Sequence, residues 1–123
     1  MSSIKECLSE AMEADGAVGV ALVDASSGMC LGSVGGGDFD LELAAAGNTE
    51  VVRAKKKIRD HLQISDRIID ILITLDTQYH LIRMSQQNED LFFYFVLDSA
   101  KSNLALARMV LRKVDQKLEA VEV

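Results

Sequence analysis

The sequence has no proline, no tryptophan, two cysteines and two histidines among its 123 residues. Without proline, the chain cannot contain a proline-rich linker. Cys7 and Cys30 fall in a predicted helix and a predicted strand without CxxC or Cys/His spacing, which indicates small packing residues in a reducing cytosol rather than a disulfide framework. His61 and His80 lack the i, i+4 partner of helical zinc sites, so we predict neither a metal nor a cofactor.

Basic residues are outnumbered by acidic ones, with 13 Lys and Arg against 19 Asp and Glu. The formal net charge is therefore −6 at pH 7. A nucleic-acid partner is therefore not expected, since phosphate binding requires a clustered positive field. The one basic cluster lies on a single predicted helix, and we interpret it as a solvated helix face. It consists of Arg53, Lys55, Lys56, Lys57 and Arg59.

Long hydrophobic runs are absent as well. No apolar segment approaches the roughly 20 residues needed to cross a bilayer. Residues 1–6 lack the charged-then-apolar form of a signal peptide, so we expect a cytoplasmic protein without membrane insertion. We expect one domain over residues 1–123, which is long enough for a hydrophobic core without disulfides or metal.

What is present is a regular succession of eight elements. Ser3 and Glu6 match a capping box, which predicts a first helix over about residues 3–14. A middle helix is predicted over about 39–62, with Asp38 as its N-cap, and a last helix begins near 104. Strands are predicted at 17–23, 29–34, 68–75, 78–84 and 91–97.

The order α-β-β-α-β-β-β-α predicts an α/β sandwich with one five-stranded antiparallel sheet. The two terminal helices should cover one face of this sheet and the middle helix the other. The run Leu91–Leu97 has no polar alternation, so both faces of that strand must be covered. The helix after it carries an apolar stripe at spacings of three and four, namely Leu104, Ala107, Leu111, Val114 and Leu118.

Catalytic motifs are missing. The segment Gly32–Gly37 lies between a strand and a helix, where a phosphate loop would sit, but it is followed by Asp38 rather than by Gly-Lys-Ser/Thr. Ser33 does not stand in a G-x-S-x-G elbow. Glu89 and Asp90 fall in a polar loop that leaves both carboxylates solvated. We predict a flexible crossover at the glycines and no enzymatic activity.

Two apolar stripes run along the predicted middle helix, although a helix that covers one sheet face needs only one. Gly47 in its middle costs about 1 kcal/mol relative to alanine, which indicates that small residues are favoured there for another reason. The first stripe is predicted to face the core and consists of Ala44, Gly47, Val51, Ala54, Ile58 and Leu62. The second stripe is predicted to meet another chain and consists of Leu41, Ala45, Asn48 and Val52.

Four segments resemble the roadblock/dynein-light-chain family of longin-like small-GTPase regulators. Residues 19–32 are similar to the first hairpin of the family, with its short acidic-glycine turn. The segment Phe39–Gly47 resembles its alanine-rich central helix. Residues 71–75 with 79–83 resemble its central meander, and 103–108 the start of its last helix.

The resemblance implies a non-catalytic homodimer that docks and regulates a small Ras-like GTPase, because members form dimers whose sheets join across a two-fold axis. In bacteria, similar stand-alone proteins regulate a polarity GTPase. It also implies that strand 68–75 lies at the sheet edge, where an unpaired apolar strand must be paired or covered. The predicted interface consists of Leu41, Ala44, Ala45, Ala46, Gly47, Asn48, Val52, Ile69, Ile71 and Ile73.

Within that set, Leu41, Asn48 and Val52 are expected to lean toward the twin helix, while Ala45 and Ala46 face outward. A charged rim of Glu42, Arg53, Lys56 and Lys57 would surround the partner patch. Arginine-finger catalysis is possible in principle, and Arg53, Arg59 and Arg83 are available for it, but nothing in the sequence directs one of them at a phosphate. Two other functions stay open: a small-molecule sensor or enzyme with an internal pocket, and a structural adaptor without a GTPase.

Overall fold

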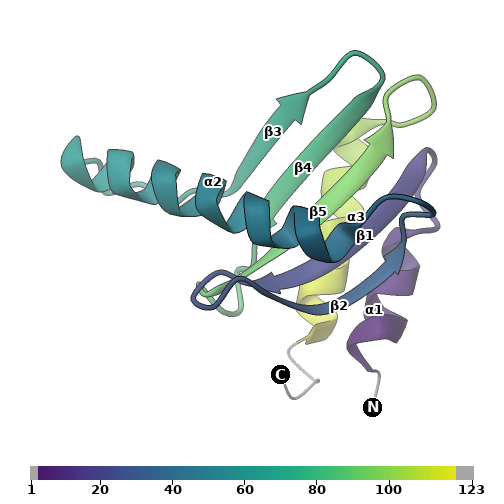
Figure 1. Cartoon of the computed structure of the whole chain (residues 1–123), viewed down its shortest axis with the longest axis horizontal. Coiled ribbons are helices and arrows are strands. Elements are labelled where there is room, and N and C mark those ends of the chain that lie inside the picture. The colour runs from purple at the N-terminus through teal and green to yellow at the C-terminus, as the bar shows by residue number, and fades with distance from the viewer. Residues whose placement is uncertain (1–2, 119–123) are drawn as a thin grey trace.

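The computed structural model describes residues 3–118, which form a sheet covered by helices on both faces (Figure 1). The element order is the predicted α-β-β-α-β-β-β-α. In chain order the elements are α1 (Ile4–Ala11), β1 (Ala17–Asp24), β2 (Met29–Gly35), α2 (Leu41–His61), β3 (Asp70–Thr74), β4 (Gln78–Met84), β5 (Leu91–Asp98) and α3 (Leu104–Leu118). Residues 1–2 and 119–123 of the predicted 1–123 domain lie outside the described part.

The five strands form one sheet in the order β2-β1-β5-β4-β3, and every neighbouring pair is antiparallel. The apolar strand β5 occupies the centre, so it is paired on both sides. The strands β2 and β3 form the two edges, which confirms the predicted edge position of β3. The β3 strand is shorter than predicted, because Ile68 and Ile69 lie before its first residue. Of these two, Ile69 still accepts a backbone hydrogen bond from the Met84 amide.

The sheet divides the interior into two apolar clusters, as the unalternating sequence of β5 requires. Phe93 and Phe95 point to the face covered by α1 and α3. Phe92 and Tyr94 point to the opposite face, covered by α2. All four rings are buried, and each contributes about 1.5–3 kcal/mol through the apolar surface removed from water. The predicted distribution of helices over the two faces is therefore confirmed.

The helix starts follow local side-chain chemistry. The hydroxyl of Ser3 accepts a hydrogen bond from the Glu6 amide at 3.1 Å, as its capping position predicted. The predicted cap of the middle helix was wrong by two residues. Asp40, rather than Asp38, accepts from the Leu43 amide at 3.0 Å, and α2 begins at Leu41.

The shift in the α2 cap follows from the glycine connector. Gly35, Gly36 and Gly37 all have positive φ, a region that other residues rarely adopt. The Gly36 amide donates to the carbonyl of Val18 at 2.8 Å, so the connector stays bound to β1 before it turns toward the helix. The segment is thus a tight crossover fixed by backbone geometry.

A buried carboxylate joins α3 to the loop between β4 and β5. Asp115 is 1% exposed and accepts a hydrogen bond from the Ser85 hydroxyl at 2.6 Å and from the Gln86 amide at 2.7 Å. The Ser85 oxygen in turn accepts from the amides of Gln87 and Asn88. One side chain thereby fixes the loop that leads into the central strand.

Candidate interaction surface

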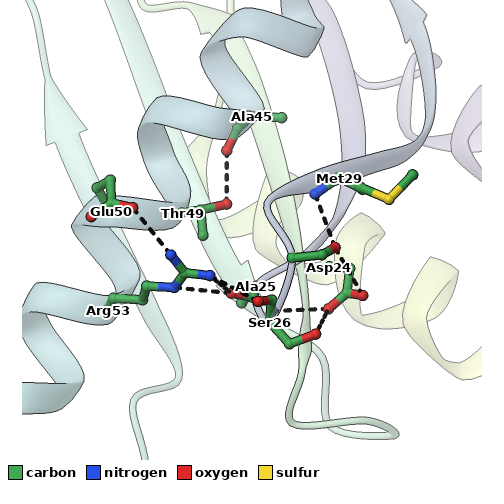
Figure 2. Close-up of polar contacts among 9 residues, drawn as sticks. Asp24, Ala25, Ser26, Met29, Ala45, Thr49, Glu50 and Arg53 are labelled. Carbon is green, nitrogen blue, oxygen red and sulfur yellow. Dashed lines mark hydrogen bonds and ion pairs between the residues drawn. The ribbon is translucent and has the colours of Figure 1, made fainter.

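The helix α2 is anchored to the first hairpin by one arginine (Figure 2). The Arg53 guanidinium donates from Nε and Nη2 to the carbonyl of Ala25, and from Nη2 to the carbonyl of Ser26 at 2.9 Å. Its Nη1 pairs with Glu50 at 3.1 Å. Arg53 was predicted to belong to a charged rim, but its guanidinium is already occupied by the turn between β1 and β2.

That turn is ordered by Asp24. Its carboxylate accepts from the hydroxyl and the amide of Ser26 and from the hydroxyl of Ser27. These bonds favour the ionised form and lower the pKa of Asp24, with the Ser26 hydroxyl as the largest cause. The acidic-glycine turn is therefore a preorganised contact for Arg53.

The buried side chains of α2 belong to the stripe that was predicted to meet another chain. Leu41, Ala45 and Val52 are buried against the sheet, and Thr49 lies between them. The prediction that Leu41 and Val52 lean toward a twin helix and that Ala45 faces outward was therefore wrong. Asn48 is half-buried and donates its side-chain amide to the carbonyl of Ala44 at 2.8 Å.

The stripe predicted to be the core is the exposed one. Ile58 is 49% exposed and Leu62 is 65% exposed, while Gly47 and Ala54 are also open to solvent. Only Ala44 and Val51 are half-buried against the sheet. The prediction assigned the two stripes to the wrong sides of the helix, because both are apolar and are separated by a fixed rotation. Helical periodicity gives their spacing but not which of them faces the sheet.

The exposed stripe lies on the side of α2 away from Arg53. At 100° per residue, Val51 and Ile58 fall roughly opposite Arg53, which contacts the β1–β2 turn. The stripe therefore faces the side of the sheet where β3 forms the edge. Figure 1 shows the C-terminal half of α2 projecting beyond the sheet, which explains why Leu62 remains exposed among the described residues.

The edge strand β3 adds further apolar surface on this side. It pairs with β4 along one side only, from Asp70 opposite Arg83 to Thr74 opposite Tyr79. Ile71 and Ile73 are half-buried beside the cluster under α2. Ile69, just before the strand, is 48% exposed. The predicted interface residues of β3 thus lie together at the open edge.

A half-buried aromatic group lies on the same face of the sheet. His80 Nδ1 lies 3.0 Å from the Tyr94 hydroxyl, and His80 Nε2 lies 3.0 Å from Oε1 of Gln78. The ring of Phe39 approaches that of His80 edge-on. Burial lowers the pKa of His80 and raises that of Tyr94. A neutral imidazole with its proton on Nε2 satisfies both contacts, with Tyr94 as donor to Nδ1.

We expect the stability of the protein to fall as the pH drops below about 6.5, the ordinary pKa of histidine. Because the folded-state pKa of His80 is lowered, the unfolded chain binds more protons in this range, and acid favours unfolding. Urea unfolding of the wild type and His80→Gln at pH 5 and pH 7.5 measures the effect. His80→Gln should flatten the pH dependence, whereas His61→Gln, at an exposed position, should not.

The two thiols stay out of this surface. Cys7 is buried under α1 and Cys30 is half-buried in β2. Burial raises the pKa of both thiols, so neither is a ready nucleophile or metal ligand. Among residues 3–118, no three His, Cys, Asp or Glu side chains gather as a metal site would require. No helix in that range has the length and hydropathy to cross a membrane.

A five-stranded antiparallel sheet with two terminal helices on one face and a central helix on the other defines the roadblock/LC7 fold, and the chain has this fold. MglB of Myxococcus xanthus is similar over 96% of this chain and 93% of its own, with a TM-score of 0.83 at 16% identity. A roadblock/LC7 domain from Streptomyces avermitilis is similar over 97% of each chain, with a TM-score of 0.83 at 9% identity.

A further structure, described as MglB with a tetrameric arrangement, matches 92% of this chain and 82% of its own, with a TM-score of 0.77 at 16% identity. No protein-family model and no curated protein sequence matches the chain. At these identities the likeness establishes the fold, and the function must be argued from the surfaces.

Proposed function

We propose that this protein is a non-catalytic homodimeric module that docks and regulates a small Ras-like GTPase. The observations that carry the proposal are the exposed apolar stripe of α2 and the apolar β3 strand, which forms an edge of the sheet and pairs on one side only. An open edge strand with isoleucines beside it is a site for pairing with another chain. The family resemblance suggests the kind of partner, and the fold shared with MglB is compatible with it.

A second copy of the chain satisfies both exposed features. Pairing of β3 with its own copy would give a continuous ten-stranded sheet, and the projecting half of α2 would lie against the partner. Gly47 and Ala54 allow two helices to approach closely, and Ile58 and Leu62 would lose their contact with water. We therefore propose that the dimer contact of α2 is this exposed stripe and not Leu41, Ala45 and Val52.

The GTPase surface is placed on the outer side of α2, which faces neither the sheet nor the proposed twin. Ala46 and Lys57 lie there, both exposed, next to the Arg53–Glu50 pair. Small and charged side chains leave a shallow surface with a polar rim, the usual form of a transient interface. Of the predicted partner residues, Ala46 is the one that keeps its outward position.

The arginines considered for arginine-finger catalysis are occupied within the chain. Arg53 binds the first hairpin, and Arg59 pairs with Asp60 at 3.1 Å. Arg83 is 8% exposed beneath α3 and lies 3.8 Å from Asp70. An arginine finger must reach the transferred phosphate from the surface. These contacts argue against an arginine finger at these three positions.

Ala46→Arg tests the platform. The variant should remain dimeric by light scattering and lose at least about tenfold in affinity for the GTPase, because a long charged side chain then occupies the centre of the contact. Nucleotide-loaded small GTPases of the source organism provide the binding partners. Ala105→Arg makes the same change at an exposed position of α3 and should bind as the wild type does.

If Ala46→Arg binds the GTPase unchanged, the platform is not on α2. If the wild-type dimer captures no small GTPase in either nucleotide state, the structural-adaptor function replaces the regulatory one. A monomeric wild type at micromolar concentration contradicts the homodimer itself.

A further inference from the structure

A hollow of about 220 Å³ lies between the C-terminal half of α2 and the end of β4. Lys56 and Arg59 enter it from α2, and Arg67 enters from the segment before β3. Ile68 and Met84 provide its apolar walls, and Glu89 lies at its border. It is formed by the flank of α2 near the sheet, so it is separate from both the dimer stripe and the Ala46 surface.

Cations outnumber carboxylates in this hollow by three to one. The Lys56 ammonium donates to the backbone carbonyl of Glu89 at 3.4 Å rather than to a carboxylate. Within residues 3–118, Arg67 makes no ion pair. Arg59 donates from Nε and Nη2 to the Asp60 carboxylate at 3.1 Å and from Nη1 to the carbonyl of Asp66 at 3.5 Å, so its guanidinium is already occupied. The hollow therefore holds more positive charge than its own residues neutralise.

Helix stability does not account for this arrangement. A cation in the last turn of α2, such as Arg59, is favoured by the helix dipole. Arg67 lies beyond the helix and comes from a different segment, so the dipole does not explain its place. Six cations and two carboxylates fall between residues 53 and 67 in a chain whose net charge is −6. The positive field is thus local and centred on the hollow.

The base of the hollow is rigid. Ser85 belongs to the lining, and its hydroxyl is fixed between Asp115 and the amides of Gln87 and Asn88. Ile68 and Met84 pack against the cluster under α2. A preorganised concave site with apolar walls and convergent charged groups has the form of a small-molecule site.

We infer that this hollow binds a soluble organic phosphate. Guanidinium groups match the paired oxygens of a phosphoryl group, and an ammonium adds a point charge. Arg67 and Lys56 would hold the phosphate, and the carbon skeleton would lie on Ile68 and Met84. Glu89 at the border would accept a hydrogen bond from a hydroxyl or amine of the ligand. The inference stands independently of the proposed GTPase partner.

The test is a titration of the ¹⁵N-labelled full chain, followed by NMR, with ADP, glucose 6-phosphate and pyrophosphate in 150 mM NaCl. Adenosine and glucose serve as the matched compounds without phosphate. At this ionic strength the Debye length is about 8 Å, so contacts outside a built site are screened. We expect saturable shifts of the Ile68, Ser85 and Glu89 amides with ADP or glucose 6-phosphate and none with adenosine or glucose.

The double variant Lys56→Gln/Arg67→Gln should weaken that binding by at least about tenfold, because two charge-assisted contacts are removed. Lys55→Gln/Lys57→Gln removes the same charge from exposed positions outside the lining and should change the affinity less than about twofold. Thermal unfolding of both variants checks that they fold.

Three results would overturn the inference. The first is the absence of saturable shifts with both ADP and glucose 6-phosphate, whether or not pyrophosphate binds. The second is an equal loss of affinity in the two double variants, which would indicate a diffuse charge effect. The third is sedimentation with phosphatidylglycerol vesicles without binding of the soluble compounds, which would assign the charge to a membrane surface.

Discussion

Gly47→Arg is expected to convert the proposed dimer into a monomer and to raise the dimer dissociation constant more than about 100-fold, because an unpaired arginine buried in an interface costs several kcal/mol. Gly47 is exposed in the chain, and a Cβ atom added there would meet no atom within 4 Å. Within one protomer the change is therefore free of steric conflict. Arginine also has the higher helix propensity, so α2 of the monomer should gain about 0.8 kcal/mol.

Sedimentation equilibrium over a range of protein concentrations measures this prediction, since the stability of an obligate dimer depends on concentration. Ala46→Arg is the matched control, because it introduces the same side chain one residue away on the outer side of α2. The control should stay dimeric. If both variants stay dimeric, the dimer contact lies away from the stripe. If both dissociate, the dimer contact includes the Ala46 surface as well.

Asp115→Ala is expected to lower the free energy of unfolding by about 3 kcal/mol, because buried hydrogen bonds to a charged group contribute about 1.5–3 kcal/mol each. The carboxylate holds the Ser85 hydroxyl and the Gln86 amide, and its loss leaves these donors without their acceptor. The loop before β5 would lose its connection to α3. A domain is stable by only about 5–15 kcal/mol, so this is a large fraction of the total.

Urea unfolding at pH 7 checks this result for wild type, Asp115→Ala and Asp115→Asn. The asparagine variant keeps one acceptor oxygen and should fall between the other two. Asp76→Ala, at an exposed turn between β3 and β4, removes the same charge and should change stability by less than about 0.5 kcal/mol. Equal effects of Asp115→Ala and Asp76→Ala would contradict a structural role for the buried carboxylate.

The fold was accessible from the sequence because each element depends on local chemistry. The unalternating run of β5 requires cover on both faces, and the period-three-and-four stripe of α3 requires one buried side. Leu111 and Val114 are buried as that stripe predicts. Ser3 occupies the predicted cap because its hydroxyl needs only an amide three residues away. Such signals can be recognised in the sequence without any knowledge of distant contacts.

The candidate surfaces could be predicted only in part from the sequence, because they depend on which side of an element meets the rest of the chain. The two stripes of α2 are both apolar, and the choice between them came from the Arg53 contact with Ala25, 28 residues away in sequence. Ala46 kept its predicted outward position, whereas Ala45, its neighbour, is buried. A rotation of one residue about the helix separates a core position from a surface one.

By itself, then, the sequence determined the order of helices and strands, the cover on both faces of the apolar strand β5 and the lack of catalytic motifs, because these follow from composition and short-range periodicity. Only the tertiary structure decided which stripe of α2 stays exposed, that Asp115 binds Ser85, and that Lys56, Arg59 and Arg67 border one hollow. These features join residues from separate elements. No local pattern encodes such pairings, because they arise only when the sheet brings its neighbouring strands and helices together.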